Sequence, residues 1–305
     1  MHATAEEARG PVGLIGLGLL GSAVAARLAA AGWTVWGYDS AAPRREALAE
    51  MGGFPKPDAA AVVGGCSVVL LCLPDSRIVG QVVHRLESVL RAGQVFLDMT
   101  TGDPQDSAAL AGWLNERGVG LVEAPVIGSS DQLRRQEALV LLSGRSEDVA
   151  RGRQVLGALG CPLREMPEGH HAVCLKLVVN LVLGLNRAAL AEGLALAEAC
   201  GLPLKDVLSV LQHSPASSRI MDSKGPKMLA RDYSPQAHLA QHLKDVRLIR
   251  ELAARRGASV PLTQTHQRLL EQAVERGWGQ ADNSALVEVY RAALVQGRPD
   301  EQPAS

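Results

Sequence analysis

The stretch VGLIGLGLLGSAVAARLAAAG, residues 12–32, sets five glycines into an apolar run. Three of them have the spacing Gly16-x-Gly18-x-x-Gly21, where a hydrophobic strand is expected to turn into a helix. There the first glycine permits a tight turn, the second lets a pyrophosphate approach the backbone, and the third lets helix pack on strand. The N–H groups and the dipole of the helix start then hold the phosphates. The stretch predicts a dinucleotide-binding turn made of Gly16, Leu17, Gly18, Leu19, Leu20 and Gly21.

An acidic residue supports this interpretation. Asp39 ends the next predicted strand, 18 residues after Gly21. A carboxylate in that place accepts hydrogen bonds from the adenine-ribose hydroxyls and repels a 2′-phosphate. Arg44 and Arg45 lie just downstream and could meet such a phosphate, so we expect NAD as the cofactor and keep NADP as the alternative. The competing interpretation is a glycine turn needed only for packing, beside an unrelated acid. Strand, turn, helix and acid in this order favour the cofactor.

The first half of the chain alternates strand-length apolar runs with helix-like segments. The runs are rich in Val and Leu and do not alternate with polar residues, which is typical of strands covered on both faces. We therefore predict a mostly parallel, doubly wound sheet of the Rossmann type. The expected strands are 12–16, 34–39, 67–73, 94–99, 120–126 and 138–144, with helices near 20–31, 43–51, 76–90, 104–117 and 146–158.

After about residue 165 the strand pattern gives way to helical spacing of Ala, Leu and Glu. Residues 170–200 could form one helix, apolar on nearly every side, that runs through the middle of a helical domain. Further helices are expected at 204–213, 236–256, 262–276 and 284–295. The predicted fold is α/β plus all-α, with a long helix between the domains. The expected domains are an NAD(P)-binding domain (1–165), an all-helical substrate and dimerisation domain (166–296) and a disordered tail (297–305).

Composition excludes several classes of partner. Lys plus Arg number 31 against 32 Asp plus Glu, and 3% of residues are aromatic, so neither a basic field nor a base-stacking surface is expected. The five cysteines are scattered without a C-x-x-C pair, as in a reduced cytosolic protein. The N-terminal MHATAEEARG lacks a signal-peptide pattern, and the apolar segment 172–199 carries too many polar residues for a membrane span. We expect a soluble cytoplasmic protein that binds a small molecule, and neither nucleic acid nor membrane.

Lys176 stands out inside the apolar segment VCLKLVVNLVLG, with Asn180 four residues later on the same helix face. Burial lowers the pKa of a lysine toward neutrality, so its amine can exchange a proton with a reacting hydroxyl. The amide could orient that amine or the substrate. The alternative is a lysine whose head snorkels to solvent, with Asn180 bonding a neighbouring helix. Composition alone favours this alternative.

Several motifs in order resemble the β-hydroxyacid dehydrogenase family over residues 11–295, which includes 3-hydroxyisobutyrate dehydrogenase and tartronate-semialdehyde reductase. Each motif alone is weak, and together they are specific. They are GLIGLGLLG at the glycine turn, CLP (72–74), DMTTGDP (98–104), EAPVIG (123–128), KLVVN (176–180), HLKDVRL (242–248) and DNSALVEVY (282–290).

The resemblance implies roles for individual residues. Lys176 would be the catalytic acid/base, and Asn180 would orient the substrate. Thr101 would contact the nicotinamide-ribose side of the cofactor, and Lys244 of the second domain would reach the cofactor and substrate. The CLP motif would add Leu73 and Pro74 to the cofactor site.

The chain also departs from the family pattern. Ile127, Gly128 and Ser129 stand where the family commonly has Ser-Gly-Gly, whose serine binds the substrate carboxylate. Ile127 has no donor, so either Ser129 or Ser130 replaces that serine, or the substrate differs. The related imine reductases carry a similar IG and an LYSG-like strand resembling LLSG (141–144), although they generally lack the lysine. His170 to Ala172 replace the Gly-x-Gly before the catalytic helix, and Ala237 replaces a phenylalanine.

The sequence therefore predicts an NAD(P)-dependent oxidoreductase of the EC 1.1.1 type. Hydride would pass between the nicotinamide and a small β-hydroxy acid or semialdehyde, with Lys176 as general acid/base. One alternative is the reduction of an imine or an unusual aldehyde, and another is a non-catalytic dinucleotide-binding protein. His238 and His242 have i, i+4 spacing, but no Cys or carboxylate cluster completes a metal site, so we expect no metal. A homodimer or tetramer is expected.

Overall fold

The computed structural model describes residues 10–296. The chain divides between Leu177 and Val178, inside helix α8 (His171–Ala199), into an N-terminal and a C-terminal unit. The domain boundary predicted after residue 165 precedes this division, and the predicted domain limits stay a prediction. The expectations for residues 1–9 and for the tail 297–305 lie outside the described residues.

The main sheet of the N-terminal unit has six strands, all parallel, in the order β3-β2-β1-β4-β5-β6. The chain leaves β1 toward β2 and β3, then crosses to the other side of β1 for β4, β5 and β6. Ligands bind such sheets at this reversal, beyond the carboxyl ends of the strands. The strands are β1 (Val12–Ile15), β2 (Val35–Tyr38), β3 (Phe54–Pro55), β4 (Val68–Leu71), β5 (Val95–Asp98) and β6 (Gly120–Glu123).

Helices cover both faces of this sheet. In β1, Leu14 belongs to one buried cluster and its neighbour Ile15 to a second. In β5, Leu97 belongs to the first cluster and its neighbour Phe96 to the second. Alternate strand residues therefore pack on opposite faces, which explains why the strands are apolar throughout. The covering helices are α1 (Leu19–Ala30), α2 (Ala42–Glu50) and α7 (Ser146–Gly157) in one cluster, and α3 (Ala59–Gly65), α4 (Ser76–His84) and α5 (Pro104–Asn115) in the other.

The prediction of a single strand over 120–126 is wrong. The chain splits there into β6 and β7 (Val126–Ile127), and β7 pairs antiparallel with β8 (Leu139–Leu142) in a second, three-stranded sheet. Pro125 lies between them and has no N–H for a ladder, so the chain changes sheet at that point. The third strand, β9 (Leu163–Glu165), and the short helix α6 (Ser130–Arg134) were not predicted.

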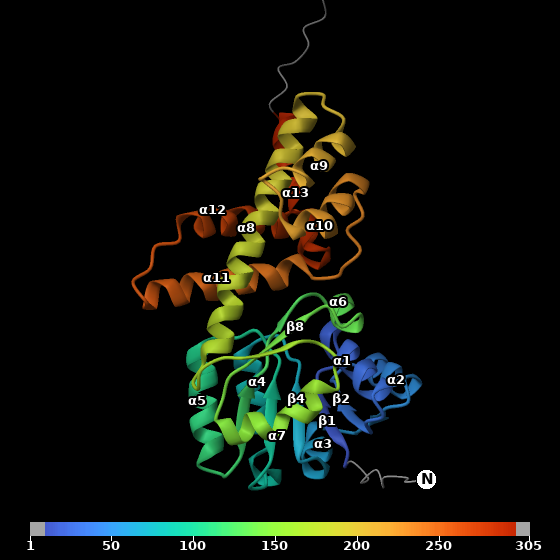
Figure 1. The fold of residues 1–305 in the computed structure, drawn as a ribbon, viewed down its shortest axis with the longest axis vertical. Helices are drawn as coiled ribbons and strands as arrows, with labels where there is room; N and C mark the ends of the chain where they lie inside the picture. The colour runs from blue at the N-terminus through green and yellow to red at the C-terminus, as the bar shows by residue number, and fades with distance from the viewer. Residues whose placement is uncertain (1–9, 297–305) are drawn as a thin grey trace, which may run out of the picture. The chain divides into compact units, whose positions relative to one another are not determined.

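The C-terminal unit is built from helices over its described residues, as predicted. Two buried clusters fill it, and α8 contributes Ala188 to one and Leu190 and Leu194 to the other. Helix α8 therefore runs through the middle of the unit (Figure 1). Its partners are α9 (Leu204–Gln212), α10 (Arg219–Ala230), α11 (Leu239–Arg255), α12 (Pro261–Glu275) and α13 (Val287–Gln296), with short 3₁₀ turns at Trp278–Gln280 and Asn283–Leu286.

Helix α10 was not predicted, because it contains Gly225 and Pro226, both unfavourable inside a helix. A Cβ on Gly225 would lie 2.5 Å from the Leu208 side chain, so the glycine lets α10 approach α9 closely. Tertiary packing overrides the local preference here.

By length and composition, α8 is the one helix among the described residues that could cross a membrane. Core helices of soluble proteins meet the same criterion. Asn180 and Arg187 are buried on this helix.

Candidate functional site

The glycine turn lies between β1 and α1 at the carboxyl end of the sheet. Gly16 has φ +95°, and a Cβ there would lie 2.2 Å from the Cys72 carbonyl oxygen. A Cβ on Gly21 would lie 1.9 Å from the Gly16 carbonyl oxygen, so only glycine fits where α1 leaves the turn. Around Gly18 the nearest atom to a Cβ is an Arg44 nitrogen, 3.9 Å away. The turn is closed at the first and third glycines and open at the second, as a cradle for a pyrophosphate requires.

The acid at the end of β2 is held by this turn. Asp39 Oδ2 accepts a hydrogen bond from Leu17 N–H at 2.8 Å and pairs with Arg44 at 3.2 Å, and Oδ1 accepts from Ala41 N–H at 2.9 Å. Burial by itself raises the pKa of Asp39, but the bonds from Ala41, Leu17 and Arg44 outweigh it, and the pKa is lowered. Asp39 is therefore a carboxylate at neutral pH, with acceptor capacity left on Oδ1 for a ribose hydroxyl. Because Leu17 N–H binds Asp39, it is directed away from a phosphate.

The two arginines after Asp39 differ in their surroundings. The Arg45 guanidinium donates to the backbone oxygens of Asp39 and Ser40. The Arg44 side chain is 55% exposed, and within residues 10–296 its hydrogen-bond partner is the Asp39 carboxylate. Of the two arginines, Arg44 has the guanidinium that pairs with the Asp39 carboxylate. Its contact with a 2′-phosphate stays a prediction.

The loops after β4 and β5 carry the other residues predicted for the cofactor. Thr100 Oγ1 accepts from Leu73 N–H at 3.2 Å, which ties the two loops together. The Leu73 side chain lies 3.2 Å from the Cβ position of Gly16, so it borders the glycine turn. Pro74 is exposed next to it, and Thr101 is half-buried next to Thr100. These residues lie at the carboxyl ends of neighbouring strands.

Lys176 lies on the part of α8 that belongs to the N-terminal unit, and its side chain is 8% exposed. Asn180, one turn later, belongs to the C-terminal unit and is also buried. Asn180 Nδ2 donates to Asp245 Oδ2 at 2.8 Å, and Lys244 Nζ pairs with Asp245 Oδ1 at 2.8 Å. One carboxylate of α11 thus contacts the side chains of both Asn180 and Lys244. Whether Lys244 reaches the cofactor stays a prediction.

The segment that departs from the family pattern ends β7 and begins α6. Ser129 caps α6: its Oγ accepts from Gln132 N–H at 3.2 Å, and Gln132 Oε1 accepts from Ser129 N–H at 2.8 Å. Ile127 is half-buried, Gly128 is exposed at φ +139°, and Ser130 is buried. The Ser129 hydroxyl oxygen therefore already accepts a hydrogen bond from Gln132 N–H, and the hydroxyl proton remains as the group it could donate to a substrate.

The two histidines with metal-ligand spacing do not converge. His238 Nδ1 donates to the Gln280 carbonyl oxygen at 2.7 Å, whereas His242 Nε2 lies 3.0 Å from His266 Nε2. Residues 10–296 contain no cluster of three or more His, Cys, Asp or Glu side chains able to hold a metal ion.

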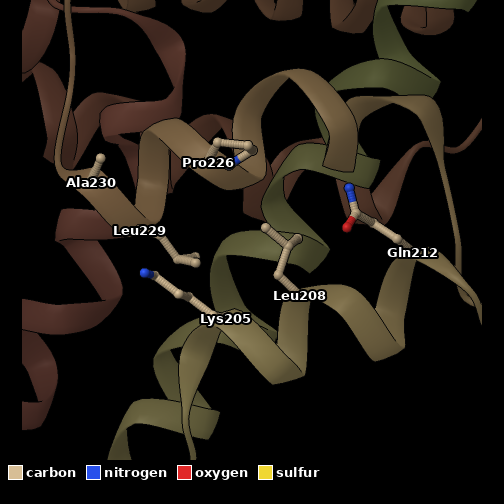
Figure 2. A pocket seen from close by; sticks show the side chains of 6 residues that line it. All are labelled: Lys205, Leu208, Gln212, Pro226, Leu229 and Ala230. Atoms are coloured by element: carbon tan, nitrogen blue, oxygen red, sulfur yellow. The ribbon is translucent and has the colours of Figure 1, made fainter.

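A pocket of the C-terminal unit is lined by a different set of residues (Figure 2). It is an apolar hollow between α9 and α10, and none of the predicted site residues borders it. It is lined by Lys205, Leu208, Gln212, Pro226, Leu229 and Ala230.

Two buried carboxylates were not singled out from the sequence. Glu123 accepts hydrogen bonds at the start of α8, and Asp282 accepts from Lys224 and from the backbone N–H groups of Gln236 and Ser284. Both stand in motifs that were recognised, EAPVIG and DNSALVEVY, but all of their named partners except Ser284 lie far away in the sequence. Only the folded chain identifies those distant partners.

Two family profiles match the chain. Residues 11–173 match the family described as the NAD binding domain of 6-phosphogluconate dehydrogenase. Residues 171–290 match the family described as NAD-binding of NADP-dependent 3-hydroxyisobutyrate dehydrogenase.

Curated relatives cover most of the chain. L-threonate dehydrogenase of Cupriavidus necator is 26% identical over 95% of this chain and 99% of that protein. 2-(Hydroxymethyl)glutarate dehydrogenase of Eubacterium barkeri is 29% identical over 92% of this chain and 94% of that protein. Cytokine-like nuclear factor N-PAC of Homo sapiens is 30% identical over 93% of this chain, which spans 51% of that protein.

Solved structures share the fold. The 3-hydroxyisobutyrate dehydrogenase from Salmonella typhimurium has a TM-score of 0.86 at 24% identity, covering 92% of this chain and 100% of that one. An imine reductase from Pseudomonas sp. is more distant, with a TM-score of 0.62 at 21% identity, covering 92% of this chain and 99% of that one. Two NAD-binding families match residues 11–290, and dehydrogenases are similar along nearly the whole chain. These matches show that this chain belongs to the NAD(P)-binding β-hydroxyacid dehydrogenase family.

Proposed function

We propose that this protein is an NAD(P)-dependent dehydrogenase that interconverts a small β-hydroxy acid and the corresponding semialdehyde. The observation that carries the proposal is Lys176, a lysine 8% exposed in the first turns of an apolar helix, in a unit that also holds the glycine turn. A buried amine is costly, and acid–base work at a reacting hydroxyl is a reason to keep one. The relatives named for threonate and hydroxymethylglutarate dehydrogenation support this substrate class.

The cofactor would occupy the carboxyl end of the main sheet. The open backbone at Gly18 and the first N–H groups of α1 would hold the pyrophosphate, and Asp39 would accept from the adenine ribose. The remaining residues proposed for the cofactor are Gly16, Leu17, Leu19, Leu20, Gly21, Leu73, Pro74, Thr101 and Lys244. When bound, the nicotinamide supplies or accepts the hydride.

In this proposal the protein supplies the proton and the orientation. Lys176 gives the hydroxyl proton in reduction and takes it in oxidation. Asn180 presents its Oδ1 and its second Nδ2–H to the substrate, because Asp245 accepts from the other Nδ2–H. Lys244 offers a positive charge to a substrate carboxylate, and Ile127, Gly128 and Ser129 border the rest of the substrate.

A second candidate reaction is the reduction of an imine or an unusual aldehyde. It is favoured by Ile127, which has no donor for a carboxylate where the family commonly has serine, and by the cap bonds of the Ser129 hydroxyl. The presence of Lys176 favours the hydroxy-acid reaction. We also propose a soluble cytoplasmic homodimer or tetramer, without nucleic-acid or membrane partners.

The test is a substrate panel with purified protein and either NAD or NADP, followed by absorbance of the reduced nicotinamide. β-Hydroxy acids and semialdehydes should turn over, and cyclic imines should not. Turnover of imines alone would replace the proposed reaction with the second candidate. Normal NADH binding with no turnover across the panel would indicate the non-catalytic alternative.

A further inference from the structure

A buried carboxylate meets the start of α8. Glu123 is the last residue of β6 and is 2% exposed. Its Oε2 accepts from the backbone N–H of Val173 at 3.1 Å, and its Oε1 accepts from His170 Nδ1 at 2.8 Å. All three residues lie in the N-terminal unit.

These bonds replace an ordinary helix cap. Helix α8 begins at His171, so Val173 carries the N–H that a capping side chain normally binds, and His170 occupies the capping position. A histidine is a poor cap for its own helix. Here Glu123, far away in the sequence, binds that N–H and also the His170 ring. Its negative charge is further favoured at the positive end of the helix dipole.

The segment before α8 is anchored to the same place. Glu123 and Ser143 exchange backbone hydrogen bonds of 2.8 and 3.0 Å. The Ser143 hydroxyl faces the carbonyl oxygens of Pro167 and Gly169. The approach to α8 and its first turn are therefore fixed to β6 and β8.

We propose that Glu123 and His170 are positioning residues for Lys176. Lys176 lies three residues after Val173, on the same face of the helix, so the bond that fixes the first turn also fixes the base of the lysine. Proton transfer requires placement to within about 0.5 Å, and a shift of about 1 Å can reduce the rate about 100-fold. His170 stands where the family pattern has a glycine, so the pair with Glu123 is a feature of this chain. The inference rests on the proposed role of Lys176.

The experiment compares His170→Ala, His170→Asn and the matched control His171→Ala, an exposed histidine at the next position. In His170→Ala we expect kcat to fall about 10-fold while the NADH dissociation constant stays within about 2-fold, because the glycine turn is untouched. In His170→Asn the side-chain Nδ2–H takes the place of Nδ1–H, so kcat should return to within about 2-fold of wild type. His171→Ala should retain the wild-type kcat.

A readout without substrate separates this inference from the proposed function. Hydrogen exchange at Val173 N–H should accelerate in His170→Ala and in Glu123→Gln, and stay slow in His171→Ala. Wild type and Lys176→Ala, assayed alongside, show whether the proposed function holds. The inference is overturned if exchange at Val173 is unchanged, if His170→Ala keeps the wild-type kcat, or if Asn restores no more activity than Ala.

Discussion

Asn180 and Asp245 share a buried hydrogen bond of 2.8 Å from Nδ2 to Oδ2, which joins α8 to α11 inside the C-terminal unit. The other oxygen of Asp245 lies 2.8 Å from Lys244 Nζ. The amide nitrogen carries two N–H donors, so Asp245 engages one of them and leaves the other, with the amide oxygen, for a further partner. Asp245 therefore holds the orientation of the Asn180 amide, and it also contacts Lys244, the cation proposed to bind the substrate carboxylate.

Replacing Asp245 by Asn should weaken substrate binding. Removing the charge takes away the strong acceptor of the Asn180 amide and the partner of Lys244, so both side chains lose their fixed orientation. We expect the substrate KM to rise about 10-fold, with the NADH dissociation constant within about 2-fold. Steady-state kinetics and NADH fluorescence measure the two. Asp206→Asn, on the exposed side of α9, is the control, and an unchanged KM in Asp245→Asn would contradict the role assigned to this carboxylate.

Lys176→Ala should reduce turnover strongly and preserve cofactor binding. General acid–base catalysis contributes about 10²- to 10⁴-fold, so kcat should fall by about that factor. Lys205→Ala changes an exposed lysine of α9 and serves as the control. Turnover at the wild-type rate in Lys176→Ala would refute the assignment.

Asp39→Asn should shift the cofactor preference toward NADP. The substitution removes the charge that repels a 2′-phosphate and releases Arg44, which lies 3.2 Å from Asp39 Oδ2. The ratio of kcat/KM with NADP to that with NAD should increase about 10-fold. Because the loss of the bonds to Leu17 and Ala41 affects both cofactors, the ratio is the informative quantity. Adding Arg44→Ala should cancel the shift, and a ratio unchanged by Asp39→Asn would remove Asp39 from cofactor selection.

Gly21→Ala should destabilise the N-terminal unit and impair cofactor binding. Its Cβ would lie 1.9 Å from the Gly16 carbonyl oxygen, and backbone cannot move aside as a side chain can. We expect a cost of about 1–3 kcal/mol, visible as a lower unfolding temperature. Gly112→Ala is the matched control, because no atom lies within 4 Å of its Cβ position in α5, and it should stabilise by up to about 1 kcal/mol. Equal unfolding temperatures for the two variants would show that the turn tolerates a side chain.

The C-terminal unit should lose stability in acid because of His266. Burial, and then the charge of Arg187, lower the pKa of His266 to about 4 from 6.5. Between these values the unfolded chain binds a proton that the folded chain does not, so stability rises with pH through this window and is lost as pH falls from about 6.5 to about 4. The loss is on the order of 3 kcal/mol. Urea unfolding midpoints across this range should show the slope in wild type and in His213→Gln, an exposed control, and a smaller slope in His266→Gln.

The fold class could be predicted from the sequence because its signals are local. The glycine turn, the apolar strands and the long helix each depend on residues close together in the chain. Where a local preference competes with tertiary packing, the sequence is less informative about which residues form a strand or a helix. Pro125 ends β6 and moves the chain to a second sheet, and α10 forms despite Gly225 and Pro226 because Gly225 packs against Leu208.

For the candidate site, too, some features follow from local sequence patterns and others only from tertiary packing. The sequence by itself determined which residues are proposed to carry the chemistry: the three glycines, Asp39, Lys176 and Asn180 stand in recognisable local patterns. Only the tertiary structure decided what surrounds them. Glu123 is 50 residues from Val173, and Asp245 is 65 residues from Asn180, and no local rule pairs them. Such pairs form because a buried polar group must find a partner, and the partner available is set by how strands and helices pack.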